Sequence, residues 1–127
     1  MDRLEKIKTK EYVRTNEGNI FQITQVIIHK KYTLIETDNF GTISESVLKE
    51  IMQEKSFDIR NLLKEGDIVI YNLKNLGHLK IGITKKYKDT RSGEEYLILG
   101  GYKLDNITVS RILTKQEFNT HCYRLED

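Results

Sequence analysis

The sequence predicts a mainly β protein that carries a few short helices. Short runs rich in β-branched and aromatic residues recur along the chain. Glycine, asparagine and aspartate lie between these runs and are typical of turns, whereas proline is absent. The two halves of the chain also repeat a similar order of landmarks on either side of a central stretch at residues 56–73.

The central stretch predicts a short helix, a glycine stop and a strand. Ser56 is a suitable N-cap, because its hydroxyl can accept a hydrogen bond from a free amide of the first helical turn. Apolar residues then recur at helical spacing as far as Leu63. Gly66 suits the left-handed position that ends a helix. The β-branched run that begins at Asp67 predicts the next strand.

The same kinds of signal predict the remaining elements. A change of phase between Ile23 and Val26 predicts a bulge in a long strand. Thr114 and Glu117 form a capping-box pattern, which predicts a short helix near the C-terminus. The predicted strands cover residues 11–15, 20–29, 32–37, 42–44, 67–73, 78–87, 95–99 and 107–113, with a helix at 45–54 and a small final strand around 123–125.

Each half follows the order strand, glycine turn, long strand, Lys-Lys-Tyr, strand, glycine turn. The landmarks are Gly18, Lys30-Lys31-Tyr32 and Gly41 in the first half, and Gly77, Lys85-Lys86-Tyr87 and Gly100 in the second. This echo favours two small SH3-like barrels or half-barrels joined by the short central helix. The predicted modules span residues 1–55 and 56–127. One fused domain is the alternative to two modules, and a chance match is the alternative to a true duplication.

Composition limits the function classes. The chain has 127 residues, of which 38% are hydrophobic and 31% charged, so it predicts a soluble domain or two very small ones. The formal net charge of +2 gives no indication of nucleic-acid binding driven by bulk charge. The single cysteine, Cys122, forms no internal disulfide and suits a reducing compartment. The charged N-terminus and the lack of a long apolar run predict a cytoplasmic protein with no membrane partner.

Three motifs follow one another in a fixed order along the chain. They are Tyr12-Val13-Arg14-Thr15 with Gly18 and Ile20; Lys55-Ser56 with Asp58-Ile59, Leu62-Leu63 and Gly66-Asp67; and Ile112-Leu113-Thr114-Lys115-Gln116-Glu117-Phe118 with Tyr123. This ordered set resembles a family of small uncharacterised proteins from phages and prophages of Gram-positive bacteria. The chain departs from the family at residues 70–73, which replace a usual Asn-Gly turn, and around Arg91. The resemblance implies an accessory protein that acts in the cytoplasm of a bacterial host, and it transfers no catalytic residue.

No motif in the chain predicts catalysis or a bound cofactor. His29, His78 and His121 are far apart in sequence, and none has a partner at metal-ligand spacing. Cys122 follows His121 directly, but adjacent side chains point apart on a strand or helix, which disfavours a nucleophile–base pair. We therefore expect a protein that is not an enzyme and has no catalytic residue, metal or cofactor.

Basic residues lie beside aromatic residues at several predicted strand ends. A cation can meet a phosphate group while the neighbouring ring stacks on a base, so the pattern suits a nucleotide-like ligand. The alternative reading is solvated strand edges, where lysine blocks edge-to-edge pairing. The residues predicted to line a ligand pocket are Arg14, Lys31, Tyr32, Lys86, Tyr87 and Arg111.

These observations leave three functional hypotheses. The first is a binding protein that counteracts host antiviral defence by sequestering a nucleotide-like signal. The second is a protein–protein inhibitor of a host defence complex, similar in role to an anti-CRISPR protein, which predicts an exposed patch of interface size. The third is a phage housekeeping factor. Because small β modules often cover leftover apolar faces by self-association, we also expect a homo-oligomer.

Overall fold

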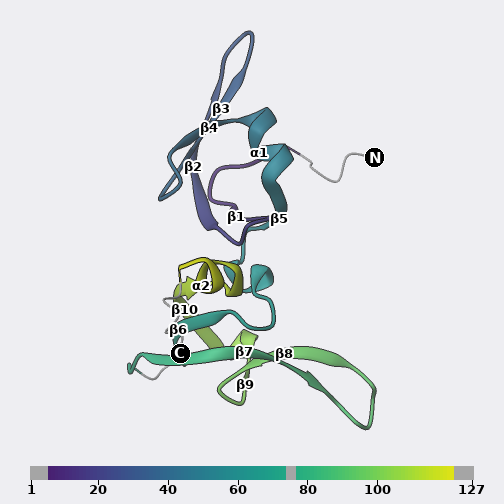
Figure 1. The fold of residues 1–127 in the computed structure, drawn as a ribbon. Helices are drawn as coiled ribbons and strands as arrows, with labels where there is room; N and C mark the ends of the chain where they lie inside the picture. The colour runs from purple at the N-terminus through teal and green to yellow at the C-terminus, as the bar shows by residue number, and fades with distance from the viewer. Residues whose placement is uncertain (1–5, 74–76, 122–127) are drawn as a thin grey trace, which may run out of the picture. The chain divides into compact units, whose positions relative to one another are not determined.

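A computed structural model describes residues 6–73 and 77–121 of the chain and confirms a mainly β fold (Figure 1). The chain divides into two compact units, Met1–Leu62 and Leu63–Asp127. Each unit contains one five-stranded antiparallel sheet. The first unit extends past the predicted boundary at residues 55 and 56, because it includes the turn that follows its last strand.

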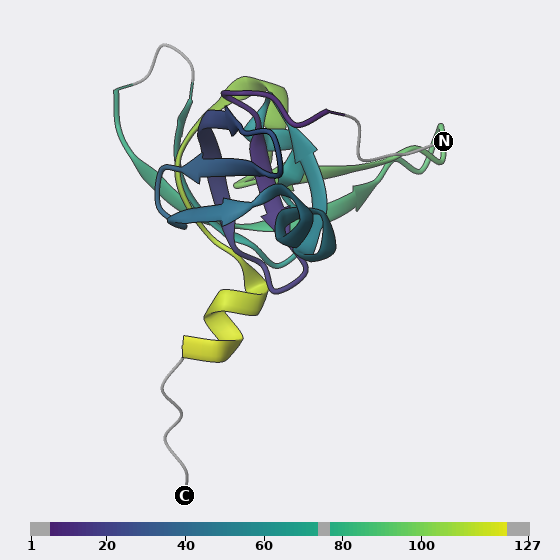
Figure 2. The ribbon, with the colours of Figure 1, turned by 90° about the horizontal axis from the view of Figure 1, so that it is seen from above.

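The first unit is a meander of four strands whose first strand also pairs with a fifth. The strand order is β4-β3-β2-β1-β5, and α1 lies beside β3 and β4 (Figure 2). Its elements are β1 (Tyr12–Thr15), β2 (Ile20–Ile28), β3 (Thr33–Thr37), β4 (Thr42–Ser44), α1 (Glu45–Ile51), β5 (Met52–Ser56) and the 3-10 turn η1 (Ile59–Leu62).

Strand β2 bends where the sequence predicts a bulge. Its first residues pair with β1, and from Ile23 onward it pairs with β3, with a register shift between Ile23 and Gln25. The bend allows β2 to pair with β1 through its first residues and with β3 through the rest, which curves the sheet. The sheet and α1 bury a cluster made of Ile7, Val13, Phe21, Ile23, Ile35, Leu48 and Met52.

The second unit has the same strand connectivity as the first. Its order is β10-β6-β7-β8-β9, so four strands again form a meander and the fifth pairs with the first. Its elements are β6 (Ile68–Leu73), β7 (Lys80–Lys88), β8 (Glu95–Leu99), β9 (Tyr102–Lys103), the 3-10 turn η2 (Leu104–Asn106), β10 (Ile107–Leu113) and α2 (Lys115–His121). The buried cluster is Leu63, Val69, Tyr71, Leu73, Leu99 and Ile107.

The glycine landmarks of the two halves occupy equivalent turns. Gly18 and Gly77 precede the second strand of their sheets, and Gly41 and Gly100 lie between the third and fourth strands. The Lys-Lys-Tyr landmarks differ, because Lys30-Lys31-Tyr32 forms the turn after β2 whereas Lys85-Lys86-Tyr87 lies within β7. The backbone repeat is therefore clearer than the repeat of these side chains.

Several elements differ from the prediction. The central helix is only a 3-10 turn, although the Ser56 hydroxyl does accept from the backbone N–H of Asp58 at 3.1 Å. The helix predicted at 45–54 ends at Ile51, and its last residues join β5, which the sequence did not predict. Strand β5 contains a polar Gln-Glu-Lys run and lies at a sheet edge, so no apolar alternation marks it. Strand β9 was also missed, and the strand predicted around 123–125 lies outside the described residues.

The start of helix α2 has the geometry that the capping-box pattern predicts. The Thr114 hydroxyl accepts from the backbone N–H of Glu117 at 3.2 Å, and the Thr114 N–H donates to the Glu117 carboxylate at 3.4 Å. The buried carboxylate of Asp67 adds two further acceptors. It accepts from the N–H of Lys115 at 3.1 Å and from the N–H of Lys64 at 2.8 Å. Asp67 therefore joins the start of β6 to the start of α2.

Candidate functional site

Arg14 lies in the interior of the first unit and not at its surface. Its side chain is 1% exposed, and Nη1 donates to the backbone carbonyl of Leu62 at 2.9 Å. In the β1–β5 register Arg14 is opposite Glu54. The guanidinium group thus holds the 3-10 turn against β1, which is a structural role within the fold.

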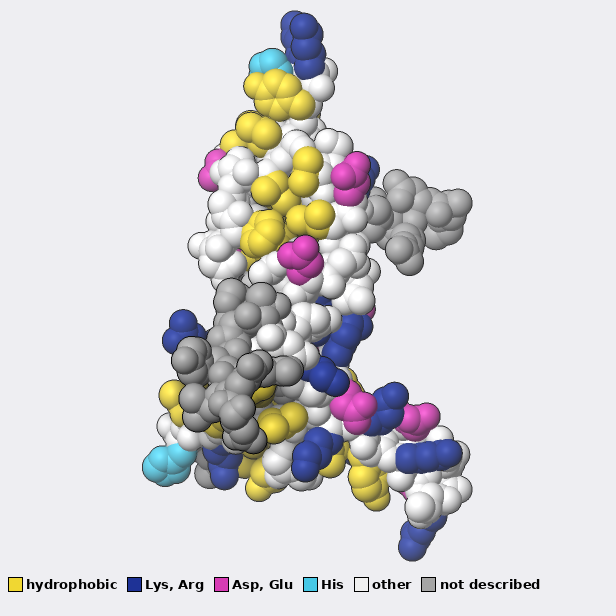
Figure 3. Space-filling model, in the orientation of Figure 1, with side chains coloured by type: hydrophobic (Ala, Val, Ile, Leu, Met, Phe, Trp, Pro, Cys, Tyr) yellow, Lys and Arg dark blue, Asp and Glu magenta, His cyan; other side chains and the backbone are white. Residues whose placement is uncertain are grey.

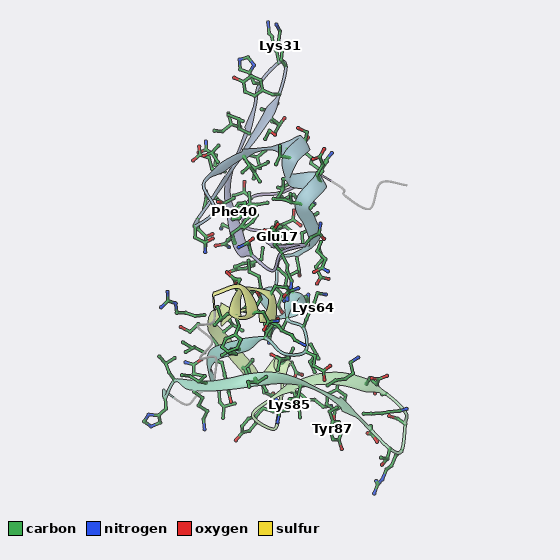
Figure 4. All side chains as sticks on the ribbon, viewed as in Figure 1. Glu17, Lys31, Phe40, Lys64, Lys85 and Tyr87 are labelled. Carbon is green, nitrogen blue, oxygen red and sulfur yellow. The ribbon has the colours of Figure 1, made fainter. Side chains whose placement is uncertain are left out.

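Lys31 lies in the turn between β2 and β3 (Figure 4). Tyr32 belongs to the same turn, and both residues line one cavity. The cavity has a volume of about 380 Å³ and also involves His29, Lys30 and the start of α1. The rings of His29 and Tyr32 are stacked, with centroids 4.5 Å apart and an interplanar angle of 9°. The metal-ligand spacing considered for His29 gives no sign of this contact, because the hairpin turn brings the ring against Tyr32.

Lys86 and Tyr87 are neighbours on β7 and therefore point to opposite faces of the sheet. Lys86 Nζ lies 3.9 Å from a carboxylate oxygen of Glu95. The Tyr87 ring packs against Tyr96 with centroids 5.2 Å apart, and Lys103 Nζ lies 4.7 Å from the centre of the Tyr96 ring. The predicted pair is consequently divided between two surfaces, and Tyr87 joins a second aromatic residue that the prediction did not include.

The outer face of the second sheet is apolar. Val69 and Tyr71 of β6 point into the core, so the alternating residues Ile68 and Ile70 face outward. The register places Ile68 opposite Ile83 and Ile70 opposite Ile81, and it places Leu113 of β10 opposite Ile68. We call this group the isoleucine face; it consists of Ile68, Ile70, Ile81, Ile83 and Leu113.

The isoleucine face is open to solvent at its β7 and β10 residues, whereas Ile68 and Ile70 on the central strand β6 are half-buried. Ile81 is 73% exposed, Ile83 53% and Leu113 39%. Ile81 and Ile83 alternate along β7 and so share one side of the strand, and the pairing with Ile70 and Ile68 places this side outward. In an antiparallel sheet with one solvent-exposed face, apolar residues normally point to the core and alternate with polar residues that point to solvent. Contiguous exposed apolar surface of this kind is typical of a site where another molecule binds.

Basic residues border the isoleucine face. Arg111 lies opposite Ile70, and Lys85 follows Ile83 on the same side of β7. Lys103 reaches the same side, because it pairs with Ile98, which is opposite Lys85. We call Lys85, Lys103 and Arg111 the basic border. These three are the charged residues at the outward register positions of β6–β10, and none is acidic. Figure 3 shows hydrophobic, basic and acidic side chains close together on one side of the second unit.

The remaining features of the described residues offer few groups that could bind a ligand or a metal ion. A second cavity of about 290 Å³ in the first unit is lined by Thr15, Asn16, Glu17, Asn19, Phe40, Glu50 and Ile51. In the part of the chain that the structure covers, no three His, Cys, Asp or Glu side chains are grouped so as to hold a metal ion. Neither α1 nor α2 has the length and apolarity needed to cross a bilayer.

Comparisons with protein-family models, with curated proteins and with solved structures find no match to this chain. The geometry of the two units is therefore the basis of the functional argument.

Proposed function

We propose that this chain is a non-enzymatic accessory binding protein that acts by binding another protein through the isoleucine face. In line with the resemblance to phage and prophage proteins, the proposed partner is a host defence protein in the bacterial cytoplasm. The observation that carries the proposal is the paired block Ile68–Ile83 and Ile70–Ile81 on an outward sheet face, with Ile81 73% exposed.

The exposed aliphatic surface can supply binding energy. Transfer of an isoleucine side chain out of water contributes about 1.5–3 kcal/mol, so several such side chains in one patch can supply most of the affinity of an interface. Their positions are set by backbone pairing in β6 and β7, so the patch is formed before the partner arrives. A preformed apolar patch loses little conformational entropy on binding.

Affinity capture with paired serine variants tests the proposal. The test variant carries Ile81→Ser and Ile83→Ser, and the matched control carries Ile28→Ser and Val47→Ser in the first unit. Ile28 and Val47 are 72% and 46% exposed, close to the 73% and 53% of the tested pair, so both variants lose similar exposed apolar surface. The tagged proteins are used as bait in a lysate of a Gram-positive host, and bound proteins are quantified by mass spectrometry.

We expect a specific host protein to be recovered with the wild type and the control but not with the test variant. Equal recovery with all three would overturn the proposal. Circular dichroism of each variant shows whether the fold is retained.

The cavity in the β2–β3 turn favours a second candidate function, sequestration of a nucleotide-like signal. Its volume of about 380 Å³ is in the range of small-molecule sites, and Lys31, Tyr32 and His29 provide a cation and two stacked rings. Isothermal titration with AMP, ATP and a cyclic dinucleotide tests it. Binding that Tyr32→Ala abolishes and Tyr87→Ala leaves intact would support the turn cavity as the site, and no heat with any nucleotide would reject it.

Self-association is a separate expectation, since small β modules often cover leftover apolar faces by forming homo-oligomers. Sedimentation velocity of the full chain over a hundredfold concentration range measures the oligomeric state directly. A concentration-independent monomer would contradict that expectation.

A further inference from the structure

We infer that the partner of the isoleucine face presents an apolar strip flanked by carboxylates. This inference rests on the proposed function, since it concerns the same face, and it adds the chemistry of the protein that binds there. The observation behind it is the sign of the border charges, which is the same at all three positions.

The register shows where the cations lie relative to the aliphatic block. One row across the sheet reads Leu113, Ile68, Ile83, and the next reads Arg111, Ile70, Ile81. Arg111 is thus on the β10 side of the block. Lys85 continues the line of Ile81 and Ile83 along β7, so it lies at the far end of the block. The apolar centre therefore has a cation at two of its margins.

Lys85 and Arg111 are the two cations nearest the aliphatic block. Among the described residues no carboxylate is paired with Lys85 or Arg111, whereas the adjacent Lys86 lies 3.9 Å from Glu95. A partner carboxylate placed at either margin would meet a cation that is already positioned and exposed. Charge complementarity of this kind increases the association rate and selects among competing partners.

The border charges disfavour a second copy of the chain on this face, and the aliphatic centre disfavours a nucleic acid. A second copy docked face to face would bring its own basic border toward this one, and like charges at an interface oppose binding. A single-stranded nucleic acid binds by stacking its bases on aromatic rings. The isoleucine face contains none, and the two rings at outward positions, Tyr87 and Tyr96, lie beyond Lys85 and pack against each other with centroids 5.2 Å apart. A protein surface with apolar and acidic residues matches both the centre and the border.

Two synthetic peptides serve as probes, because the natural partner is unidentified. One alternates isoleucine with glutamate over nine residues, and the other replaces each glutamate with lysine. Each is titrated into the ¹⁵N-labelled full chain, and amide chemical shifts report where it binds. The variants are Lys85→Glu and, as matched control, Lys86→Glu, which changes the net charge equally but on the opposite face of β7.

We expect the glutamate peptide to shift amides of β6, β7 and β10 and to bind at least about tenfold more tightly than the lysine peptide. Lys85→Glu should reduce that affinity about tenfold and make it less sensitive to salt, whereas Lys86→Glu should change it less than about twofold. Equal binding of both peptides, shifts confined to other strands, or self-association that masks β6 and β7 would each overturn the inference.

The outcome separates this inference from the proposed function. If the host protein captured by the wild type is lost with the Ile81 and Ile83 substitutions but retained with Lys85→Glu and Arg111→Glu, the face binds protein and its partner is not acidic. If capture is unaffected by the isoleucine substitutions, the proposed function itself fails.

Discussion

The hydroxyl group of Tyr71 occupies the space beside Gly100 that a β-carbon at that position would need. Tyr71 is 2% exposed in the core of the second unit, and Gly100 has φ +59° in the turn between β8 and β9. One side chain of β6 therefore determines which residue the β8–β9 turn can carry. This contact also explains why Gly100 and the adjacent Gly101 are not equivalent.

Gly100→Ala should destabilise the protein more than Gly101→Ala does. Both glycines have positive φ, so alanine costs about 1–2 kcal/mol at either position. Only at Gly100 does the new methyl group overlap Tyr71, which adds about 1–3 kcal/mol, whereas no atom lies within 4 Å of a β-carbon at Gly101. Urea unfolding of both variants measures the difference. Adding Tyr71→Phe should recover part of the loss in Gly100→Ala, and no recovery would show that the hydroxyl is not the obstacle.

Asp67→Ala should lower the free energy of unfolding by about 2–4 kcal/mol. The substitution leaves the backbone N–H groups of Lys64 and Lys115 without the acceptors that the buried carboxylate provides. Asp67→Asn keeps one oxygen acceptor and should lose less. Thermal unfolding followed by circular dichroism gives both values. If the two variants were equally unstable, charge rather than acceptor geometry would be the important property of Asp67.

Thr114→Ala should destabilise the start of helix α2 by about 1 kcal/mol. The Thr114 hydroxyl accepts from the N–H of Glu117, and alanine has no acceptor. Thr114→Ser retains the hydroxyl and serves as the control. Hydrogen exchange should therefore show faster exchange of the Glu117 amide in the alanine variant, with the serine variant close to wild type. Unchanged exchange in Thr114→Ala would mean that the Asp67 contacts alone hold the helix start.

Arg14→Ala should reduce stability without affecting binding at either candidate surface. The change removes the hydrogen bond from Nη1 to the carbonyl of Leu62 and leaves a buried site that alanine cannot fill, at a cost of about 2–4 kcal/mol. Urea unfolding measures the stability, and the peptide and nucleotide titrations described above measure binding at a temperature where the variant is folded. If the folded variant lost affinity for one ligand specifically, Arg14 would have to be a ligand-binding residue after all.

Predictions that depend on neighbours in sequence were confirmed at several positions. The capping box at Thr114 and Glu117 forms as expected, because both partners lie within one helical turn. Gly66 adopts φ +96°, and the phase change after Ile23 marks a register shift. In each of these cases a few consecutive residues contain the whole signal.

Predictions that depend on distant neighbours were less complete. Strand β5 is polar and is held by pairing with β1, so its own residues do not mark it as a strand. Arg14 was predicted as a ligand contact from its charge, whereas the carbonyl that it binds belongs to Leu62, 48 residues away in sequence. The cavity beside His29 and Lys31 is completed by Ser44, Glu45 and Ser46, which are distant from the β2–β3 turn in sequence.

The sequence by itself determined the mainly β class, most strand positions, the glycine turns and the cap of α2, because these depend on local propensity and on the period of two along a strand. It also showed that Ile81 and Ile83 share one side of β7. Only the tertiary structure decided that this side faces outward beside Ile68 and Ile70, with Lys85 and Arg111 at its margins. The physical reason is that alternation defines two faces of a strand equally well, and the packing of the other elements decides which of them is buried.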